Sequence, residues 1–182
     1  MTTNKWSLDQ THSEIHFKVK HMMISTVTGQ FSKFSSSVET VGDDFRTAKI
    51  QFTADVDSIS TNNEQRDAHL KNGDFFDVPN YPHITFRSTN IAKVDDENYK
   101  VHGELTMRGV TKNIILDVEF GGIMQDPWGN TRAGFTIAGK INRQDYAISF
   151  GGVTETGGLL LSDEVKISAN AEFVKESALV EA

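Results

Sequence analysis

The stretch Ile15-His16-Phe17-Lys18-Val19-Lys20-His21 decides the fold that this sequence predicts. Its apolar residues at 15, 17 and 19 alternate with polar ones, which is the period of a β-strand with one buried face. His21 falls on the apolar face of that strand. The same alternation predicts further strands over residues 29–38, 50–56, 83–91, 99–107, 114–120, 135–141 and 165–173, which gives about eight in all.

One segment, residues 62–71, breaks the alternation. It is rich in helix-forming residues, Asn62 is its expected N-cap, and Asn72-Gly73 supplies a stop signal. Turn sequences such as Asp126-Pro127-Trp128-Gly129-Asn130 separate the strands. The pattern predicts an all-β barrel or sandwich with one short helix. The length of the strands favours an eight-stranded antiparallel barrel, whose interior is wide enough for one small ligand.

The composition excludes several classes of protein. A chain of 182 residues fits a single domain, expected over residues 1–182, and the absence of cysteine excludes disulfides, thiolate metal sites and cysteine nucleophiles. Eighteen basic residues against 25 acidic ones give a net charge of −7, which argues against nucleic acid as a partner. The first residues lack the apolar core of a signal peptide. We therefore expect a cytoplasmic protein for the chain as given, or a periplasmic one if a leader has been removed.

Motifs along the whole chain resemble the YceI-like family. The opening carries Trp6-Ser7-Leu8-Asp9, His12-Ser13 and Val27-x-Gly29-x-Phe31; the middle carries Arg66-Asp67-x-His69-Leu70, Phe75-Phe76-Asp77 and Tyr81-Pro82-x-Ile84-x-Phe86; the end carries Gly103-x-Leu105-Thr106, Asp126-x-Trp128-Gly129 and Ile141-Asn142-Arg143. They occur in order over residues 6–173. The resemblance implies a lipocalin-like barrel with an elongated apolar cavity. That cavity would hold a polyisoprenoid, such as a prenyl diphosphate or an isoprenoid quinone, or another long-chain amphiphile.

His21 is the sharpest candidate for contact with the headgroup of such a ligand. If its face of the strand points inward, an imidazole lies in an apolar lumen, where a phosphate is a natural partner and burial would shift the titration of the ring. The alternative is a core histidine that is hydrogen-bonded to a backbone carbonyl or to a neighbouring Ser or Thr.

The expected helix and one strand end supply three further headgroup candidates: Arg66, His69 and Arg143. If the helix covers one mouth of the barrel, Arg66 or His69 would meet an anionic head while Leu70 seals the lumen. The alternative is that Arg66 and Asp67 anchor the helix to the barrel rim through ion pairs.

The guanidinium of Arg143 is suited to phosphate or carboxylate oxygens, because its N–H groups form a planar fork. The alternative is a rim salt bridge to Asp145 or Asp126.

Apolar residues on the alternating faces and the helix form the expected wall for a ligand tail. They are Phe17, Val19, Phe31, Phe34, Phe52, Leu70, Phe76, Phe86, Leu105, Phe135 and Ile137. In a filled barrel these side chains are ordinary core. In a hollow barrel each buried methylene of the ligand contributes about 0.8 kcal/mol. Periodicity leaves both options open, and the family resemblance favours the hollow barrel.

Neither a metal site nor a catalytic centre is expected. His12 and His16 lie four residues apart on an extended segment, about 13 Å from each other, which is too far to chelate one ion. The sequence has no Gly-x-Ser-x-Gly elbow and no glycine-rich cradle for a nucleotide. We therefore expect a binding protein without a cofactor that sequesters or transports its lipid. The alternatives are an enzyme acting on such a lipid at His21, or a ligand-free barrel serving as a stress-associated interaction module. The long strands would also permit a homodimer.

Overall fold

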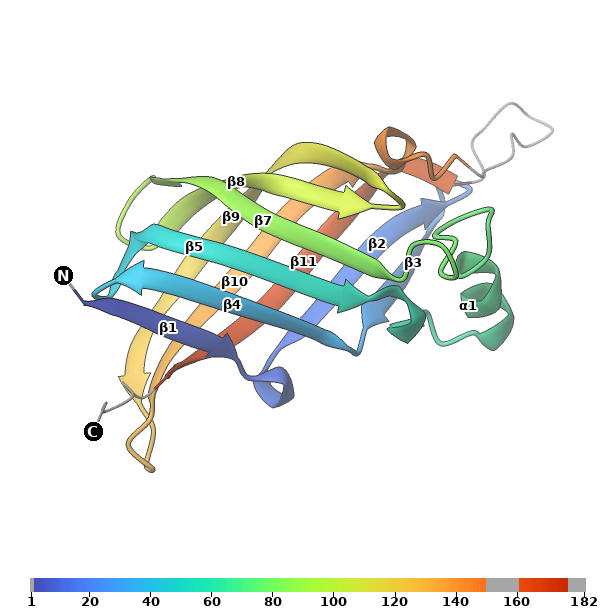
Figure 1. Cartoon of the computed structure of the whole chain (residues 1–182). Helices are drawn as coiled ribbons and strands as arrows, with labels where there is room; N and C mark the ends of the chain where they lie inside the picture. The colour runs from blue at the N-terminus through green and yellow to red at the C-terminus, as the bar shows by residue number, and fades with distance from the viewer. Residues whose placement is uncertain (1, 150–160, 177–182) are drawn as a thin grey trace.

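The computed structural model describes residues 2–149 and 161–176, most of which lie in β-strands (Figure 1). The strands are β1 (Thr3–Leu8), β2 (Glu14–His21), β3 (Ser25–Phe31), β4 (Phe34–Val41), β5 (Asp44–Asp55), β6 (Ile59–Ser60), β7 (His83–Lys93), β8 (Asn98–Met107), β9 (Val110–Gln125), β10 (Thr131–Asn142) and β11 (Leu161–Lys175). The α-helix is α1 (Glu64–Leu70), and three single-turn helices are η1 (Gln10–His12), η2 (Val56–Ser58) and η3 (Arg143–Tyr146). No helix in these residues is long and apolar enough to cross a membrane.

Eight of the strands form a closed antiparallel ring. Its order is β1-β4-β5-β7-β8-β9-β10-β11, and β11 pairs back with β1. The remaining strands extend this wall towards α1, since β2 pairs with the earlier part of β11, β3 with β2, and β6 with β3. The predicted eight-stranded antiparallel barrel with one short helix is therefore confirmed.

Two details of the strand prediction were wrong. The expected strand over residues 29–38 is two strands, because the chain bends at Ser32 and Lys33, between β3 and β4. The sequence pattern also missed β1, in which only Trp6 and Leu8 are apolar. Tertiary packing holds β1: the Trp6 indole is 1% exposed, lies 5.3 Å from the ring of Phe45 and donates a hydrogen bond of 3.0 Å to the hydroxyl of Thr40.

Helix α1 is shorter than the expected segment, residues 62–71. It also begins one residue later than expected, because its N-cap is Asn63 and not Asn62. Asn62 has a φ of 60°, in the left-handed region, and Asn63 is the N-cap, whose side chain accepts a hydrogen bond of 3.0 Å from the backbone N–H of Arg66. The helix lies at one end of the barrel, beside the ends of β5 and β7 (Figure 1).

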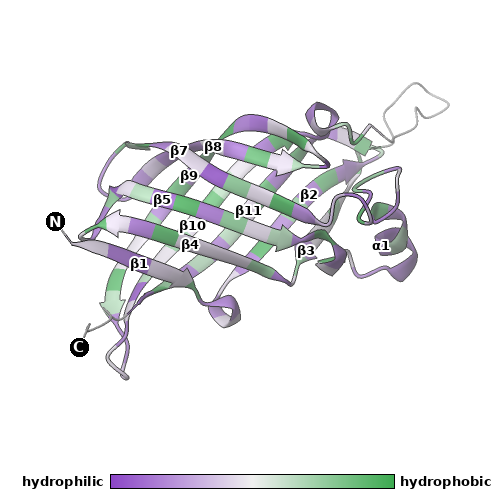
Figure 2. Ribbon diagram, viewed as in Figure 1, coloured by the Kyte–Doolittle hydropathy of each residue, from purple (hydrophilic) through white to green (hydrophobic). Residues whose placement is uncertain are grey.

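The strands alternate between apolar and polar residues along their length, as Figure 2 shows for β4, β5 and β7. One phenylalanine ring of the interior lies so close to the neighbouring strand that the residue opposite it has to be a glycine. Gly29 of β3 lies opposite Phe17 of β2, and a Cβ at Gly29 would stand 2.1 Å from the Phe17 ring. The absence of a side chain at Gly29 therefore lets the Phe17 ring lie across β3.

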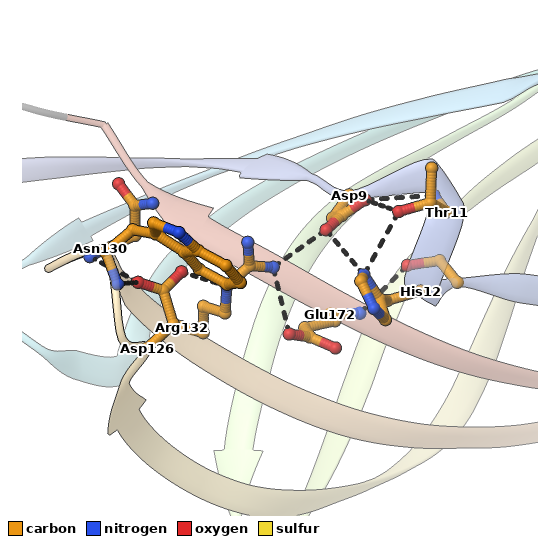
Figure 3. A network of polar contacts seen from close by, with 9 residues as sticks. Asp9, Thr11, His12, Asp126, Asn130, Arg132 and Glu172 are labelled. Carbon is orange, nitrogen blue, oxygen red and sulfur yellow. Dashed lines mark hydrogen bonds and ion pairs between the residues drawn. The ribbon is translucent and has the colours of Figure 1, made fainter.

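A charged network surrounds Arg132, near the start of β10 (Figure 3). The Arg132 guanidinium lies 2.8 Å from carboxylate oxygens of both Asp9 and Asp126 and 3.1 Å from Glu172. These contacts connect the β9–β10 turn to the β1–η1 junction and to β11. Hydrogen bonds from Arg132 lower the pKa of Asp126 to about 2, and they also hold the pKa of Asp9 well below its usual value.

Candidate functional site

Two cavities lie inside the barrel, end to end. The larger has a volume of about 620 Å³ and is lined in part by α1. The smaller, of about 150 Å³, is lined by residues of the far end such as Leu8, Phe45 and Phe173. Ile15, Phe52 and Ile167 line both cavities. The two cavities therefore adjoin at these three side chains.

The wall of the larger cavity is mainly apolar, with polar groups gathered where the chain turns at the α1 end. The polar groups at this end come from the β2–β3 hairpin (His21, Ser25, Thr26), from the segment between β6 and α1 (Thr61), from α1 (Arg66, His69) and from η3 (Arg143). His16, farther along β2, also lines the cavity. All four headgroup candidates thus line one cavity, although they lie far apart in the sequence. A cavity of this size argues against the alternative of a filled barrel, in which the wall residues would be ordinary core.

His21 is the last residue of β2, opposite Ser25 of β3 and Leu161 of β11. Its side chain is half-buried and faces the larger cavity. Within the part of the chain that the structure describes, no hydrogen-bond partner reaches the imidazole. The alternative of a core histidine bonded to a carbonyl or a hydroxyl therefore does not describe this side chain.

Thr61 connects α1 to the barrel through two residues of the helix. Its buried hydroxyl donates to a carboxylate oxygen of Asp67 at 2.5 Å and accepts a hydrogen bond of 2.7 Å from Nε of Arg66. Nη2 of Arg66 also donates to the Thr61 carbonyl at 2.6 Å. Arg66 and Asp67 do anchor the helix, but through hydrogen bonds to Thr61 and not through the ion pairs that the alternative proposed.

His69 and Leu70 both line the larger cavity, on the same face of α1 as Arg66. Nε2 of His69 lies 2.9 Å from a carboxylate oxygen of Asp74, and the His69 ring packs edge-on against Phe75 at 5.0 Å between centroids. These contacts fix the orientation of the imidazole next to the cavity.

Arg143 is 5% exposed and is held by backbone carbonyls. Nε donates to Ser162 at 3.0 Å, Nη1 to Ile148 at 2.8 Å, and Nη2 to Leu161 at 3.4 Å. Burial lowers the pKa of Arg143. The guanidinium thus connects η3 to the start of β11, where the pairing of β11 with β2 is irregular.

The alternative for Arg143, a rim salt bridge to Asp145 or Asp126, does not describe its ion pair among the described residues. Its carboxylate neighbour is Asp163, at 3.7 Å, while Asp126 pairs with Arg132 at the other end of the barrel. The side chain of Arg143 turns inward from η3, which places it among carbonyls and not at the rim.

The expected tail residues divide between the two cavities. Phe17, Val19, Phe31, Leu70, Phe76 and Leu105 line the larger cavity; Phe34, Phe86, Phe135 and Ile137 line the smaller one; and Phe52 lines both. All of them therefore face an interior space, in two connected groups that periodicity alone could not separate.

Sequence reasoning missed the hydroxyl groups at the polar end. Ser25 and Thr26 were missed because the strand that contains them was expected to begin at Gly29, whereas β3 begins four residues earlier. Thr61 had no signal in the pattern, since its role depends on two helix residues that reach back to it. Within residues 2–149 and 161–176, no group of three or more His, Asp or Glu side chains is arranged to hold a metal ion.

Comparisons of the sequence with known proteins find a matching domain model and similar proteins. The model of the YceI-like domain matches residues 6–173. A UPF0312 protein of Staphylococcus aureus (strain N315) is 42% identical over 169 residues, which cover 92% of this chain and 96% of the relative.

Solved structures share the barrel. The Campylobacter jejuni YCEI protein matches with a TM-score of 0.75 and 34% identity, covering 87% of this chain and 90% of that one. Burkholderia cenocepacia BcnA matches with a TM-score of 0.77 and 25% identity, covering 91% and 98%. A polyisoprenoid binding domain from Saccharophagus degradans has a TM-score of 0.70 at 19% identity, covering 94% and 98%, and this last likeness shows the fold alone.

Proposed function

Because the chain belongs to the YceI-like family, we propose that it binds a polyisoprenoid or similar long-chain amphiphile inside its barrel and sequesters or transports it. The observation that carries this proposal is the cavity of about 620 Å³, apolar along its wall and polar at the end beside α1. A ligand with a long apolar tail and one polar head has the same distribution of polarity. A polyisoprenoid binding domain from Saccharophagus degradans has the same fold, so a barrel of this kind is compatible with that class of ligand.

The tail would lie against the phenylalanines of the larger cavity and extend past Phe52 into the smaller one. Each methylene removed from water contributes about 0.8 kcal/mol, so most of the binding free energy would come from the tail. Binding should accordingly depend little on salt.

The head would lie near His21, Arg66 and His69. His21 is the strongest of these candidates, because it faces the cavity and has no partner within the described residues. Arg66 is held in place by Thr61 through Nε and Nη2, which positions its guanidinium at the cavity. For Arg143, three hydrogen bonds to carbonyls favour a role in shaping the wall beside the head, with any contact to the head coming second.

The test is a pair of ligands with one tail and two heads, geranylgeranyl diphosphate and geranylgeraniol. The wild-type protein should bind both. His21→Ala should weaken the diphosphate more than the alcohol, and His83→Ala is the matched control, because His83 is exposed and lines neither cavity. Equal weakening of the two ligands by His21→Ala would remove the proposed role of His21. Failure of the wild-type protein to bind either ligand would argue against the proposed function itself.

The same experiment addresses the enzyme alternative. Under the binding proposal, the diphosphate is recovered intact after incubation with the protein. Hydrolysis or isomerisation that disappears in His21→Ala would instead support an enzyme acting at that histidine.

A further inference from the structure

The hairpin between β2 and β3 ends in an exposed apolar tip, Met22-Met23-Ile24. These three side chains are 43%, 55% and 84% exposed. The residues on either side of the tip, His21 and Ser25, both line the larger cavity. The apolar tip therefore stands at the rim of the polar end of that cavity.

The turn itself is unusual for its residues. Met22 and Met23 have φ angles of 53° and 58°, and the backbone N–H of Ile24 donates to the carbonyl of His21 at 3.2 Å. Met22 and Met23 are the central pair of a β-turn within the three-residue loop that joins His21 to Ser25. A turn with both central residues in the left-handed region favours Asn-Gly, because side chains other than Asn and Asp are disfavoured there. Two methionines violate both the turn preference and the preference for polar residues at a loop tip. Such departures from local rules concentrate at functional sites.

A row of lysines crosses the outer face of the barrel behind this tip. Lys140 of β10 lies opposite Lys166 of β11, which lies opposite Lys18 of β2, and Lys20 is two residues nearer the tip. Like charges directly opposite each other on neighbouring strands repel. In the part of the chain that the structure describes, none of the four ammonium groups lies within 4.0 Å of a carboxylate. Glu164, two residues before Lys166 on β11, is an acidic neighbour of the row.

The row does not follow from a generally basic composition, since the whole chain has a net charge of −7. Unpaired lysines that face one another indicate a surface that meets anionic groups from outside. Along β2, Lys20 is about 7 Å and Lys18 about 13 Å from Met22. Lysines at these distances would remain at the level of lipid headgroups when the tip enters a bilayer.

We propose that the apolar tip and the lysine row form a docking surface for an anionic phospholipid bilayer. Met22, Met23 and Ile24 enter the interfacial region while Lys18, Lys20, Lys140 and Lys166 face the headgroups, the combination by which peripheral proteins bind anionic membranes. Docking in this orientation places the polar end of the larger cavity at the membrane surface. A lipid could then move between the bilayer and the barrel without exposing its tail to water.

The test measures co-flotation of the purified protein with vesicles of phosphatidylcholine alone or mixed with phosphatidylglycerol. The wild-type protein should float with the mixed vesicles and should dissociate when salt is added. Met22→Asn with Met23→Gly removes the apolar side chains and introduces the residues that this turn prefers, so the variant should fold. It should bind about tenfold more weakly.

A second variant, Lys18→Gln with Lys166→Gln, should lose binding by a similar factor of about ten. Its matched control, Lys49→Gln with Lys112→Gln, removes the same charge from exposed lysines of other strands and should bind as the wild type does. The proposal is overturned if the wild-type protein does not float with anionic vesicles. An acidic protein would then be the expected partner of this surface. Equal binding by the Met22→Asn/Met23→Gly variant would also overturn the proposal. The assay adds no ligand for the cavity, so its outcome is independent of the proposed lipid binding.

Discussion

Phe34 of β4 packs against Phe52 of β5 at 6.3 Å between ring centroids, and Phe52 lines both cavities of the barrel. Phe34 lines only the smaller one. The Phe52 ring therefore stands where a tail that fills the larger cavity would continue into the smaller cavity, with Phe34 supporting it from the far side.

This position makes the size of residue 52 a determinant of tail length. Phe52→Leu should widen the junction and raise affinity for longer prenyl chains relative to shorter ones, whereas Phe52→Trp should narrow it and reverse that preference. Both variants keep an apolar residue in the core, which limits their cost in stability. Titration with prenyl alcohols of increasing length checks the prediction. Identical length preferences in all three proteins would show that tails do not pass Phe52.

Thr61 should control how firmly α1 covers the cavity. Thr61→Val removes the hydroxyl that bonds both Arg66 and Asp67, so the helix should loosen and bound lipid should leave faster. The free energy of unfolding should also fall by about 1–3 kcal/mol, because the Asp67 carboxylate loses a partner. Thr61→Ser, which keeps the hydroxyl, is the control. Transfer of a fluorescent lipid to acceptor vesicles gives the release rate, and equal rates for Val and Thr at this position would contradict the prediction.

The network at Arg132 should make stability depend on pH. Its hydrogen bonds lower the pKa of Asp126 from 3.8 to about 2 and lower that of Asp9 in the same direction. A lowered carboxyl pKa contributes stability that is fully present above the unfolded-state value of about 4 and is lost as pH falls through the folded-state value. Arg132→Gln should therefore melt a few degrees below the wild type at neutral pH, and the difference should shrink between pH 4 and pH 2.

Arg87→Gln is the matched control for that series. Arg87 makes an exposed ion pair with Glu104 at 3.2 Å, and such pairs contribute little to stability. Melting temperatures of the three proteins from pH 7 to pH 2 test the prediction. A difference between Arg132→Gln and the wild type that stays constant over this range would contradict it.

Tyr146→Phe should stabilise the protein. The side chain is 1% exposed, its hydroxyl has no hydrogen-bond partner within the described residues, and burial raises the pKa of Tyr146 to about 12. Removing an unsatisfied buried hydroxyl should raise the free energy of unfolding by about 1 kcal/mol. Denaturant unfolding measures the change. A loss of stability in the variant would contradict the prediction, because it would mean that the hydroxyl is hydrogen-bonded in the folded protein.

Much of the barrel could be predicted because the alternation of side chains records which face of each strand is buried. His21 shares its face with Phe17 and Val19, and the structure places all three against one cavity. The strand β1 could not be predicted, because its place depends on Trp6 packing against Phe45 and bonding Thr40, which are distant in sequence.

The hydrogen-bond partners of the candidate cations could not be predicted from the sequence either. Arg143 donates to carbonyls of Leu161 and Ser162 at the irregular start of β11, and Arg66 is held by a threonine that follows a two-residue strand. Alternation shows which way a side chain points, but it does not show which polar atoms the closed barrel brings next to it. The closed topology brings Arg66, His69 and Arg143 to the same cavity as His21.

The most direct test of lipid binding is native mass spectrometry of the freshly purified protein, followed by organic extraction and identification of what is released. The proposed function predicts a one-to-one adduct that extracts as a prenyl or other long-chain amphiphile, and an apo form that takes up added prenyl lipid at the same ratio. A protein that carries no adduct and stays at its apo mass with prenyl diphosphates, isoprenoid quinones and fatty amides would contradict it.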